Sequence, residues 1–192
     1  MNQENLLIEK IEKIKNTGVS NKIRQSIYNC IYDEQYNEIE IRVKSNESAL
    51  KKLKIRDYEK AEDIRDIVGV MITTDTKEEA YNIAKKIILK NPICKVEDYI
   101  QNPKNGYKSI HINYAIKTKE IEDIPVEIQI KTEDMKKAQN LVHDLIYKNE
   151  HIPTKMRNTL SKIAFKYIEY KQELEKHSLS QNQYIYKFNE IK

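Results

Sequence analysis

The chain has 192 residues, a length that fits one domain of ordinary size with room for a helical appendage. Its 34 basic and 30 acidic residues leave a formal net charge of +4, a balance that favours one local phosphate site over a surface built to coat nucleic acid. No apolar run approaches the roughly 20 residues that a membrane span needs, and the N-terminal segment is too charged for a signal peptide. We therefore expect a cytoplasmic protein.

Two helices are predicted before the first strand. Apolar residues recur at helical spacing over residues 4–16, and Gly18 supplies a stop signal. Ser20 is the expected N-cap of the second helix. The next segment, Glu38–Lys44, alternates apolar and charged residues, which is typical of a half-buried strand. A short helix is predicted over residues 46–56.

The remaining chain predicts a mixed sheet. Asp66–Thr74 is nearly all apolar and β-branched, as in a strand buried on both faces. Apolar and polar residues alternate in Ser109–Lys117 and again over residues 124–132. The other predicted elements are helices over 77–89, 133–149 and 153–176, a shorter helical tail segment, and a strand over 93–99. The fold class is therefore α/β (α+β), a mixed sheet with helices on one side and at both ends.

One of only three glycines lies in the loop DYIQNPKNGYKSIH, residues 98–111. Gly106 has Lys104, Lys108 and His111 close by in the sequence. A turn this rich in donors and cations predicts a bound ligand.

Polar side chains converge on the face of the predicted sheet that points away from the core. They are Arg42, Lys44, Asp66, Ser109, His111, Glu127, Gln129 and Lys131. Alternation alone produces such rows on an open sheet, so an ordinary solvent-facing surface is the alternative. However, Asp66 and Glu127 stand at the edge of apolar strands, where an unpaired carboxylate is costly. The set favours Mg²⁺ held by the acids and phosphates held by the bases.

Other common sites are not indicated. The sequence contains neither a Walker loop nor a G-x-G-x-x-G motif. The four histidines are too scattered for a zinc motif, and the pair formed by His143 and Asp144 has no further ligands nearby in the sequence. Cys30 and Cys94 lack metal-ligand spacing and are expected to be buried, reduced thiols.

Five segments, in order, resemble the synthetase domain of the RelA/SpoT family, and most closely its stand-alone form, the small alarmone synthetases. The segments are RVKSNESALKKL from Arg42, DIRDIVGV from Asp63, DYIQNPKNGYKSIH, VEIQIKT from Val126 and HDLIYK from His143. The resemblance runs to about Ile168 and implies a nucleotidyltransferase-like fold. The implied reaction transfers pyrophosphate from ATP to the 3′-hydroxyl of GDP or GTP, with GMP as a further candidate acceptor, and yields (p)ppGpp and AMP.

The resemblance also implies roles for individual residues. Asp66 matches the ligand of the Mg²⁺ ion that bridges the ATP phosphates, and Glu127 matches the glutamate that orients or deprotonates the acceptor hydroxyl and also contacts the metal. The positions that match the ATP side are Arg42, Lys44, Ser48, Lys52 and Met71. The positions that match the acceptor side are Lys104, Tyr107, Lys108, His111, Gln129, Lys131, His143, Tyr147 and Lys148.

Two expectations concern the acceptor side in particular. Gly106 is expected to let the turn carry Tyr107 over the guanine as a stacking platform. His143 and Tyr147 are four residues apart in a predicted helix, so they are expected to share a face.

Two positions depart from the pattern that the family resemblance implies. Met71 stands where an arginine commonly forms the second face of an adenine clamp, with Arg42 as the first. Lys131 stands at the arginine of the usual EIQIRT segment, which keeps a cation but loses the planar fork. Both carboxylates are present, so an active enzyme is expected.

Two other functions are weighed against alarmone synthesis. Toxic relatives pyrophosphorylate the 3′ end of tRNA, although a tRNA-binding face would be expected to be more basic. An inactive nucleotide sensor or RNA-binding module is the other alternative, supported by Met71 and opposed by Asp66 and Glu127. Hydrolysis of the alarmone is not expected, because the residues before Arg42 contain no histidine for the paired-histidine metal site that the resemblance assigns to the hydrolase.

A single synthetase domain over 1–192 is predicted, with N-terminal helices over 1–37, a catalytic core over 38–149 and C-terminal helices over 150–192. The apolar residues of the last segment recur at helical spacing: Leu160, Ile163, Ala164, Ile168 and Leu174. This stripe either caps the domain or joins copies of the chain. Because the resemblance implies tetramers through this region, a homo-oligomer is expected. RNA binding is not indicated.

Overall fold

The structure is a computed structural model that describes residues 2–117, 119, 121, 123–149 and 151–189, without the side chains of residues 147, 154 and 178–189. The chain divides into two compact units. The first contains residues 1–100 and 109–133, and the second contains residues 101–108 and 134–192. Each unit has its own apolar cluster.

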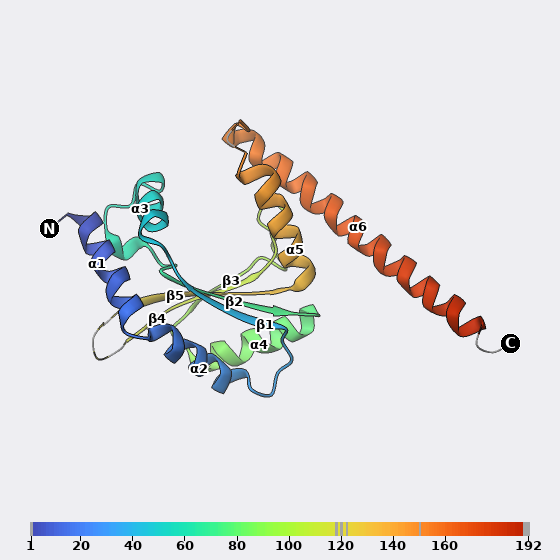
Figure 1. The fold of residues 1–192 in the computed structure, drawn as a ribbon, viewed down its shortest axis with the longest axis horizontal. Helices are drawn as coiled ribbons and strands as arrows, with labels where there is room; N and C mark the ends of the chain where they lie inside the picture. The colour runs from blue at the N-terminus through green and yellow to red at the C-terminus, as the bar shows by residue number, and fades with distance from the viewer. Residues whose placement is uncertain (1, 118, 120, 122, 150, 190–192) are drawn as a thin grey trace. The chain divides into compact units, whose positions relative to one another are not determined.

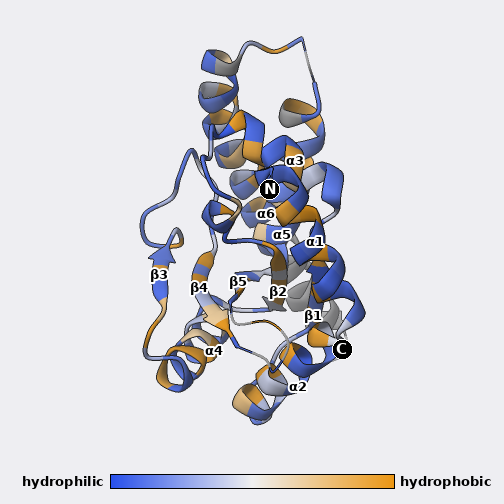
Figure 2. Cartoon of the chain, turned by 90° about the vertical axis from the view of Figure 1, so that its left-hand side faces the viewer, coloured by the Kyte–Doolittle hydropathy of each residue, from blue (hydrophilic) through white to orange (hydrophobic). Residues whose placement is uncertain are grey.

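The first unit is built on a five-stranded mixed sheet in the order β1-β2-β5-β4-β3 (Figure 1). Strands β2 and β5 run parallel, whereas the other neighbouring pairs are antiparallel. The strand bounds are β1 Glu38–Val43, β2 Val68–Thr74, β3 Lys95–Asp98, β4 Ile110–Ile116 and β5 Ile124–Thr132. The predicted mixed α/β fold is confirmed. Figure 2 shows the edge strand β3 largely in the hydrophilic colour, and charged edge strands resist pairing with other chains.

Two helices, α2 (Val19–Ile31) and α4 (Lys77–Lys90), lie together on one face of this sheet (Figures 1 and 2). A capping box at Thr76 and Glu79 starts α4, since each side chain accepts a hydrogen bond from the other residue's backbone N–H. The prediction that Ser20 caps the second helix was wrong. Helix α2 begins at Val19, two residues before the start that a Ser20 cap would give; Val19 is buried, and the N-cap residue Gly18 lies in the left-handed region.

The other elements of the first unit lie toward the N-terminal ends of the parallel strands β2 and β5 or pack on one another. They are α1 (Gln3–Asn16), α3 (Asn46–Ile55) and the 3₁₀ turn η1 (Ala61–Asp63). Helix α1 contacts all of α3, η1 and β1. These contacts fix α3, which follows β1 directly, at one end of the sheet.

Strand β2 is less buried than its composition predicted. Val68, Val70 and Ile72 are in the core beneath the helices, but Gly69 and Met71 on the opposite face are only half-buried. The strand is therefore fully covered on one face and partly accessible on the other.

The second unit consists of α5 (Glu133–Val142), one π-helical turn η2 (His143–Tyr147), α6 (Thr154–Asn189) and residues 101–108. Its apolar cluster contains Ala138, Val142, Ile146 and Phe165. The sequence predicted two helices after residue 153, but α6 is continuous because no proline or glycine interrupts it. Within the described residues, neither α6 nor any other helix combines the length and apolar character needed to cross a membrane.

The glycine loop forms a tight two-residue turn at Asn105 and Gly106. Their φ angles are 55° and 88°, and Lys104 and Tyr107 exchange backbone hydrogen bonds of 3.2 and 3.0 Å across the turn. Positive φ at both central residues is the signature of a type I′ turn, for which Asn-Gly is the favoured sequence. A Cβ atom built on Gly106 would lie 2.6 Å from the Cβ of Phe165 in α6. The glycine is therefore required for the turn and for its packing on α6.

We expect Gly106→Ala to lower the free energy of unfolding by roughly 2–5 kcal/mol, because backbone strain adds to a steric clash. Gly18→Ala is the matched control: its φ is 63°, but no atom lies within 4 Å of the added Cβ, so only strain of about 1–2 kcal/mol is expected. Urea denaturation of both variants measures the difference. Equal losses would show that Phe165 does not constrain the turn.

Candidate functional site

The face of the sheet opposite α2 and α4 carries two rows of polar side chains. Strand register places Arg42, Gly69, Glu127 and Asn113 opposite one another across β1, β2, β5 and β4. The next row contains Glu40, Met71, Gln129 and His111 in the same strand order. Alternation within each strand predicted the face that these polar side chains occupy, and the register shows which of them are neighbours across the four strands.

Asp66 lies two residues before β2 and is held by two lysines. Lys44 Nζ and Lys52 Nζ each lie 2.9 Å from Asp66 Oδ2. Burial raises the pKa of the Asp66 carboxyl, but the hydrogen bonds from Lys52 and Lys44 outweigh it, and the pKa lies below its ordinary value. Asp66 is therefore ionised at neutral pH, and two cations surround it.

Local structure explains why both lysines reach Asp66. The backbone N–H of Lys44 donates to Ile67 O at 2.8 Å, which ties the end of β1 to the start of β2. Ser45 then caps α3 by accepting from the Ser48 N–H at 3.2 Å, and Lys52 lies in the second half of that helix. The N-terminus of α3 is thus placed beside the carboxylate, with Ser48 exposed in its first turn.

Arg42 and Met71 lie on the same face of the sheet. A Cβ on Gly69 would approach Arg42 Nε at 3.3 Å, so the arginine side chain extends across the glycine. Arg42 is exposed and Met71 is half-buried. The positions that the resemblance assigned to the ATP side are therefore grouped around β1, β2 and α3.

Glu127 is held by hydrogen bonds on both of its oxygens. Gln129 Nε2 donates to Oε2 at 2.7 Å, and His111 Nδ1 lies 3.4 Å from Oε1. Burial raises the pKa of Glu127, but the interactions with His111 and Gln129 more than compensate, so its pKa lies below the ordinary value despite repulsion from Asp66. Glu127 is likewise ionised at neutral pH.

Two residues that the sequence placed on the polar face are buried. Lys131 is 0% exposed, and its Nζ donates to Gln129 Oε1 at 2.9 Å. Ser109 is also 0% exposed, and its hydroxyl donates to Ile130 O at 3.1 Å on the neighbouring strand. Both lie on the predicted polar face, but alternation within a strand does not reveal which of its residues are covered, and their burial was not predicted.

Tyr99 and Glu97 belong to the environment of His111 and were not predicted. The rings of Tyr99 and His111 meet edge to face, with centroids 5.1 Å apart and an interplanar angle of 89°. Glu97 lies opposite His111 across β3 and β4. The sequence predicted a strand over residues 93–99 but did not show which strand lies beside it. The contacts of Tyr99 and Glu97 with His111 therefore could not be predicted.

The carboxylates have the character of a divalent metal site that shares its ion with a substrate. Asp66 Oδ1 is buried and accepts no hydrogen bond, so one oxygen is available for a ligand. Within the part of the chain that the structure describes, no group of three or more His, Cys, Asp or Glu residues could hold a metal. Mg²⁺ typically takes one or two carboxylates and completes its shell with phosphates and water, which fits Asp66 and Glu127.

The other predicted acceptor residues belong to the second unit. Tyr107 is half-buried against the apolar cluster of that unit, and Lys108 pairs with Glu169 of α6. Lys104 is exposed. The side chain of Tyr147 lies outside the described residues.

His143 and Lys148 flank the π-helical turn at the end of α5. The Lys148 N–H donates to His143 O at 3.0 Å, a five-residue step that replaces the predicted α-helical spacing. The side chains of His143 and Lys148 both approach exposed Asp144, at 3.6 and 2.7 Å.

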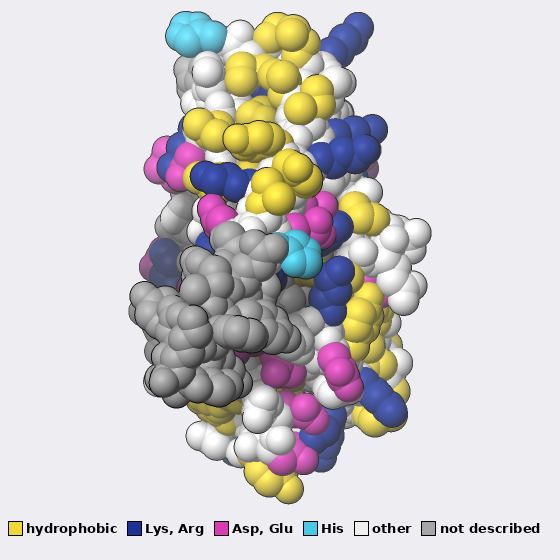
Figure 3. All heavy atoms as spheres, turned by 90° about the vertical axis from the view of Figure 1, so that its right-hand side faces the viewer, with side chains coloured by type: hydrophobic (Ala, Val, Ile, Leu, Met, Phe, Trp, Pro, Cys, Tyr) yellow, Lys and Arg dark blue, Asp and Glu magenta, His cyan; other side chains and the backbone are white. Residues whose placement is uncertain are grey.

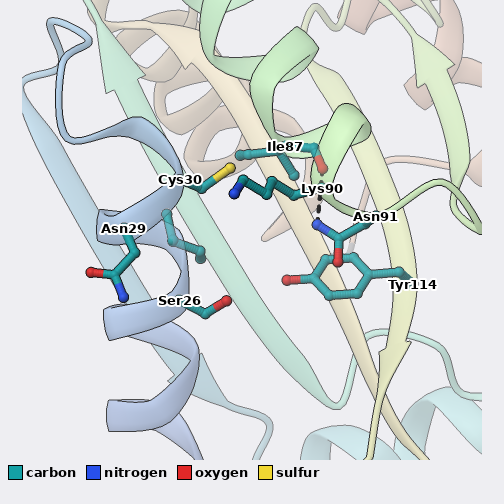
Figure 4. Close-up of a pocket in the computed structure, with 8 residues that line it drawn as sticks. Ser26, Asn29, Cys30, Ile87, Lys90, Asn91 and Tyr114 are labelled. Carbon is teal, nitrogen blue, oxygen red and sulfur yellow. Dashed lines mark hydrogen bonds between the residues drawn. The ribbon is translucent and has the colours of Figure 1, made fainter.

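Two surface pockets of the first unit share Tyr114 in their linings. One is lined in part by Arg65, Asn113 and Pro125. The other lies between α2 and α4, where the Tyr114 hydroxyl points toward α2 (Figure 4) and Cys30 Sγ donates to Lys86 O of α4 at 3.3 Å. Burial raises the pKa of Tyr114 to about 12. This second pocket contains none of the predicted site residues.

Comparison with known proteins agrees with this geometry. The region found in RelA/SpoT proteins matches residues 41–152. The chain is 37% identical over 154 residues to GTP pyrophosphokinase YwaC of Bacillus subtilis (strain 168), covering 71% of each chain. It is similar in structure to small alarmone synthetase 2 from Bacillus subtilis, with a TM-score of 0.66, 30% identity, and coverage of 91% of this chain and 97% of the other.

A second solved structure shares the fold at lower identity. Small alarmone synthetase 1 from Bacillus subtilis, bound to its product pppGpp, gives a TM-score of 0.58 and 24% identity, with 93% of this chain and 94% of the other covered. The region that the family model matches contains both carboxylates, strands β2, β4 and β5, and the end of β1. The chain therefore belongs to the RelA/SpoT family.

Proposed function

We propose that this chain is a GTP pyrophosphokinase that acts in the cytoplasm and transfers pyrophosphate from ATP to the 3′-hydroxyl of GDP or GTP, with GMP as a further candidate. The products are (p)ppGpp and AMP. The observation that carries the proposal is the pair of ionised carboxylates, Asp66 and Glu127, on one face of the sheet among Arg42, Lys44 and Lys52. Family membership and the similarity to a named GTP pyrophosphokinase support the reaction.

The donor nucleotide is proposed to bind at β1 and α3. Arg42 offers a flat guanidinium that can stack on adenine, and the N-terminus of α3 with Ser48 favours phosphate oxygens. Asp66 and Glu127 would hold Mg²⁺, which when bound neutralises phosphate charge during phosphoryl transfer. Lys44 and Lys52 compensate the charge of Asp66 in the protein alone, and both can turn to phosphate oxygens when a nucleotide arrives.

The acceptor is proposed to lie beside Glu127. Because this carboxylate is ionised and held on both oxygens, it can accept a hydrogen bond from the 3′-hydroxyl and orient its lone pair for attack. Tyr107 is proposed to stack on guanine, and lysines 104, 108 and 148 with His143 are proposed to bind phosphates or ribose.

Specific observations weigh against the two alternatives, pyrophosphorylation of tRNA and an inactive nucleotide-binding or RNA-binding module. Both carboxylates are present and ionised, which an inactive module would not require. The net charge of +4 gives no excess that would favour tRNA as the acceptor. Similarity to a GTP pyrophosphokinase over 71% of the chain favours a free nucleotide.

The acceptor assay tests this function. Incubated with labelled ATP and Mg²⁺, the protein is expected to label GDP or GTP and not tRNA. Glu127→Gln is expected to reduce product formation by at least about a hundredfold, because it removes the group that orients and deprotonates the hydroxyl. Glu59→Gln, at an exposed acid outside the site, is the matched control. Label in tRNA, or an unchanged rate in Glu127→Gln, would overturn the proposal.

Substitutions of Met71 test the proposed binding site for ATP. Its half-buried thioether lies on the same face as Arg42 but brings no charge. We expect Met71→Arg to lower the KM for ATP by roughly threefold to thirtyfold, because a cation over the adenine ring gains cation–π attraction. Met71→Leu keeps an apolar side chain and should leave this KM nearly unchanged. If the arginine variant has the wild-type KM for ATP, adenine does not bind beside residue 71.

We also propose that the chain forms a homo-oligomer, a tetramer, through α6. The predicted apolar stripe divides between two faces of this helix: Leu160, Ala164 and Ile168 pack on the apolar cluster of the second unit, whereas others are exposed. The exposed apolar residues recur at steps of four, three and four, as in a coiled-coil seam. They are Ile163, Tyr167, Tyr170 and Leu174, at 60%, 66%, 61% and 50% exposure. Figure 3 shows hydrophobic side chains gathered in the upper part of the face along which α6 runs.

Light scattering during size-exclusion chromatography measures the assembly. The wild-type mass is expected to be a multiple of the 22.8 kDa monomer. Ile163→Glu combined with Tyr170→Glu should shift it toward the monomer, because two charges would be buried in the seam. Lys162→Glu changes charge on the same helix and should leave the mass unchanged. A monomeric wild type would contradict this part of the proposal.

A further inference from the structure

Three alternate residues of β5 form a directed chain of hydrogen bonds on the polar face. Lys131 Nζ donates to Gln129 Oε1 at 2.9 Å, and Gln129 Nε2 donates to Glu127 Oε2 at 2.7 Å. All three side chains leave the same face of one strand, so their order is set by the period of two along β5.

The direction of this chain follows from the chemistry of its two ends. A lysine ammonium can only donate hydrogen bonds, and an ionised carboxylate can only accept them. The Gln129 carboxamide must therefore turn its oxygen to Lys131 and its N–H₂ to Glu127. A reversed amide would place its N–H₂ against the ammonium and its oxygen against the carboxylate, and both contacts would be repulsive.

Burial separates Lys131 from the residues that can touch a nucleotide. Lys131 is 0% exposed, whereas Gln129 and Glu127 are half-buried. A buried ammonium needs compensation by hydrogen bonds and negative charge, and Glu127 supplies the charge through Gln129. The other charged or titratable groups that act on Glu127 are His111 on β4 and Asp66 before β2, with Tyr99 beside His111.

We propose that Lys131 is a positioning residue for the reaction: it orients the Gln129 carboxamide, which in turn holds Glu127 in place, and it does not contact either nucleotide. This inference rests on the function proposed above, and it differs from the acceptor-binding role that the family resemblance implied for Lys131. An arginine at this position would also only donate hydrogen bonds, so either cation can orient the Gln129 carboxamide.

Steady-state kinetics separates positioning from binding. Lys131→Met removes the donor and keeps the length and apolar stem of the side chain, and it is expected to lower kcat roughly tenfold or more while leaving the KM of both nucleotides within about twofold. Lys131→Arg should restore most of the rate. Lys85→Met, at an exposed lysine of α4, is the control for loss of a positive charge.

A double-mutant cycle tests whether Lys131 acts through Gln129. In a Gln129→Leu background, Lys131→Met should cause no further loss, because the amide that it orients is absent. If the two losses multiply, or if Lys131→Met raises the acceptor KM with kcat unchanged, Lys131 acts directly on the nucleotide and the proposal is wrong.

A measurement that does not depend on catalysis distinguishes this inference from the proposed function. In protein labelled with ¹⁵N-glutamine, the Gln129 side-chain N–H₂ signals are assigned by their loss in Gln129→Leu. They should shift in Lys131→Met and in Glu127→Gln, and return toward the wild-type position in Lys131→Arg. Unchanged signals in a folded Lys131→Met protein would overturn the positioning role. If the wild type makes no alarmone but the signals shift as expected, the proposed function is wrong and the positioning of Gln129 by Lys131 is still supported.

Discussion

Parallel pairing of β2 with β5 is the constraint on which the rest of the site depends. Val68 opposes Val126 and Gly69 opposes Glu127, so the starts of both strands meet at one edge of the sheet. Asp66 lies just before one strand and Glu127 near the start of the other. Antiparallel pairing would have placed these carboxylates at opposite edges. The parallel arrangement needs a crossover, and α4 occupies it on the face that carries no site residue.

Charge compensation makes two neighbouring carboxylates tolerable before any ligand binds. Asp66 is held by two lysines, and Glu127 by a histidine, a glutamine and, through that glutamine, a buried lysine. Without these partners, burial would raise both pKa values and so favour the neutral form of two acids that a metal or a hydroxyl needs ionised. The same cations are suited to phosphate oxygens, so the site that is neutralised in the protein alone is also prepared for a nucleotide.

The second unit shows how one motif can serve structure and function together. The Asn-Gly turn was predicted as a ligand-holding loop, and the structure adds a packing reason for the glycine: the turn lies against Phe165, and Asn105 and Lys108 pair with Asn158 and Glu169 of α6. Tyr107 is consequently held in a fixed place on its own unit. A stacking residue on a rigid turn loses little entropy when it binds a base.

Much of this protein was determined by local sequence. Alternation in Glu38–Val43, Ile110–Ile116 and Ile124–Thr132 identified the strands and the face that each polar residue occupies, including Glu127 and Lys131. Asp66 was named from its place at the start of an apolar strand, and Lys52 from the resemblance to the family. These features depend on near neighbours in the chain, and so the sequence alone was sufficient. Only tertiary structure decided that Lys131 is buried, that Tyr99 meets His111, and that the apolar residues of α6 divide between two faces. Those outcomes depend on which distant segments cover a side chain, and periodicity within one element carries no information about its covering partner.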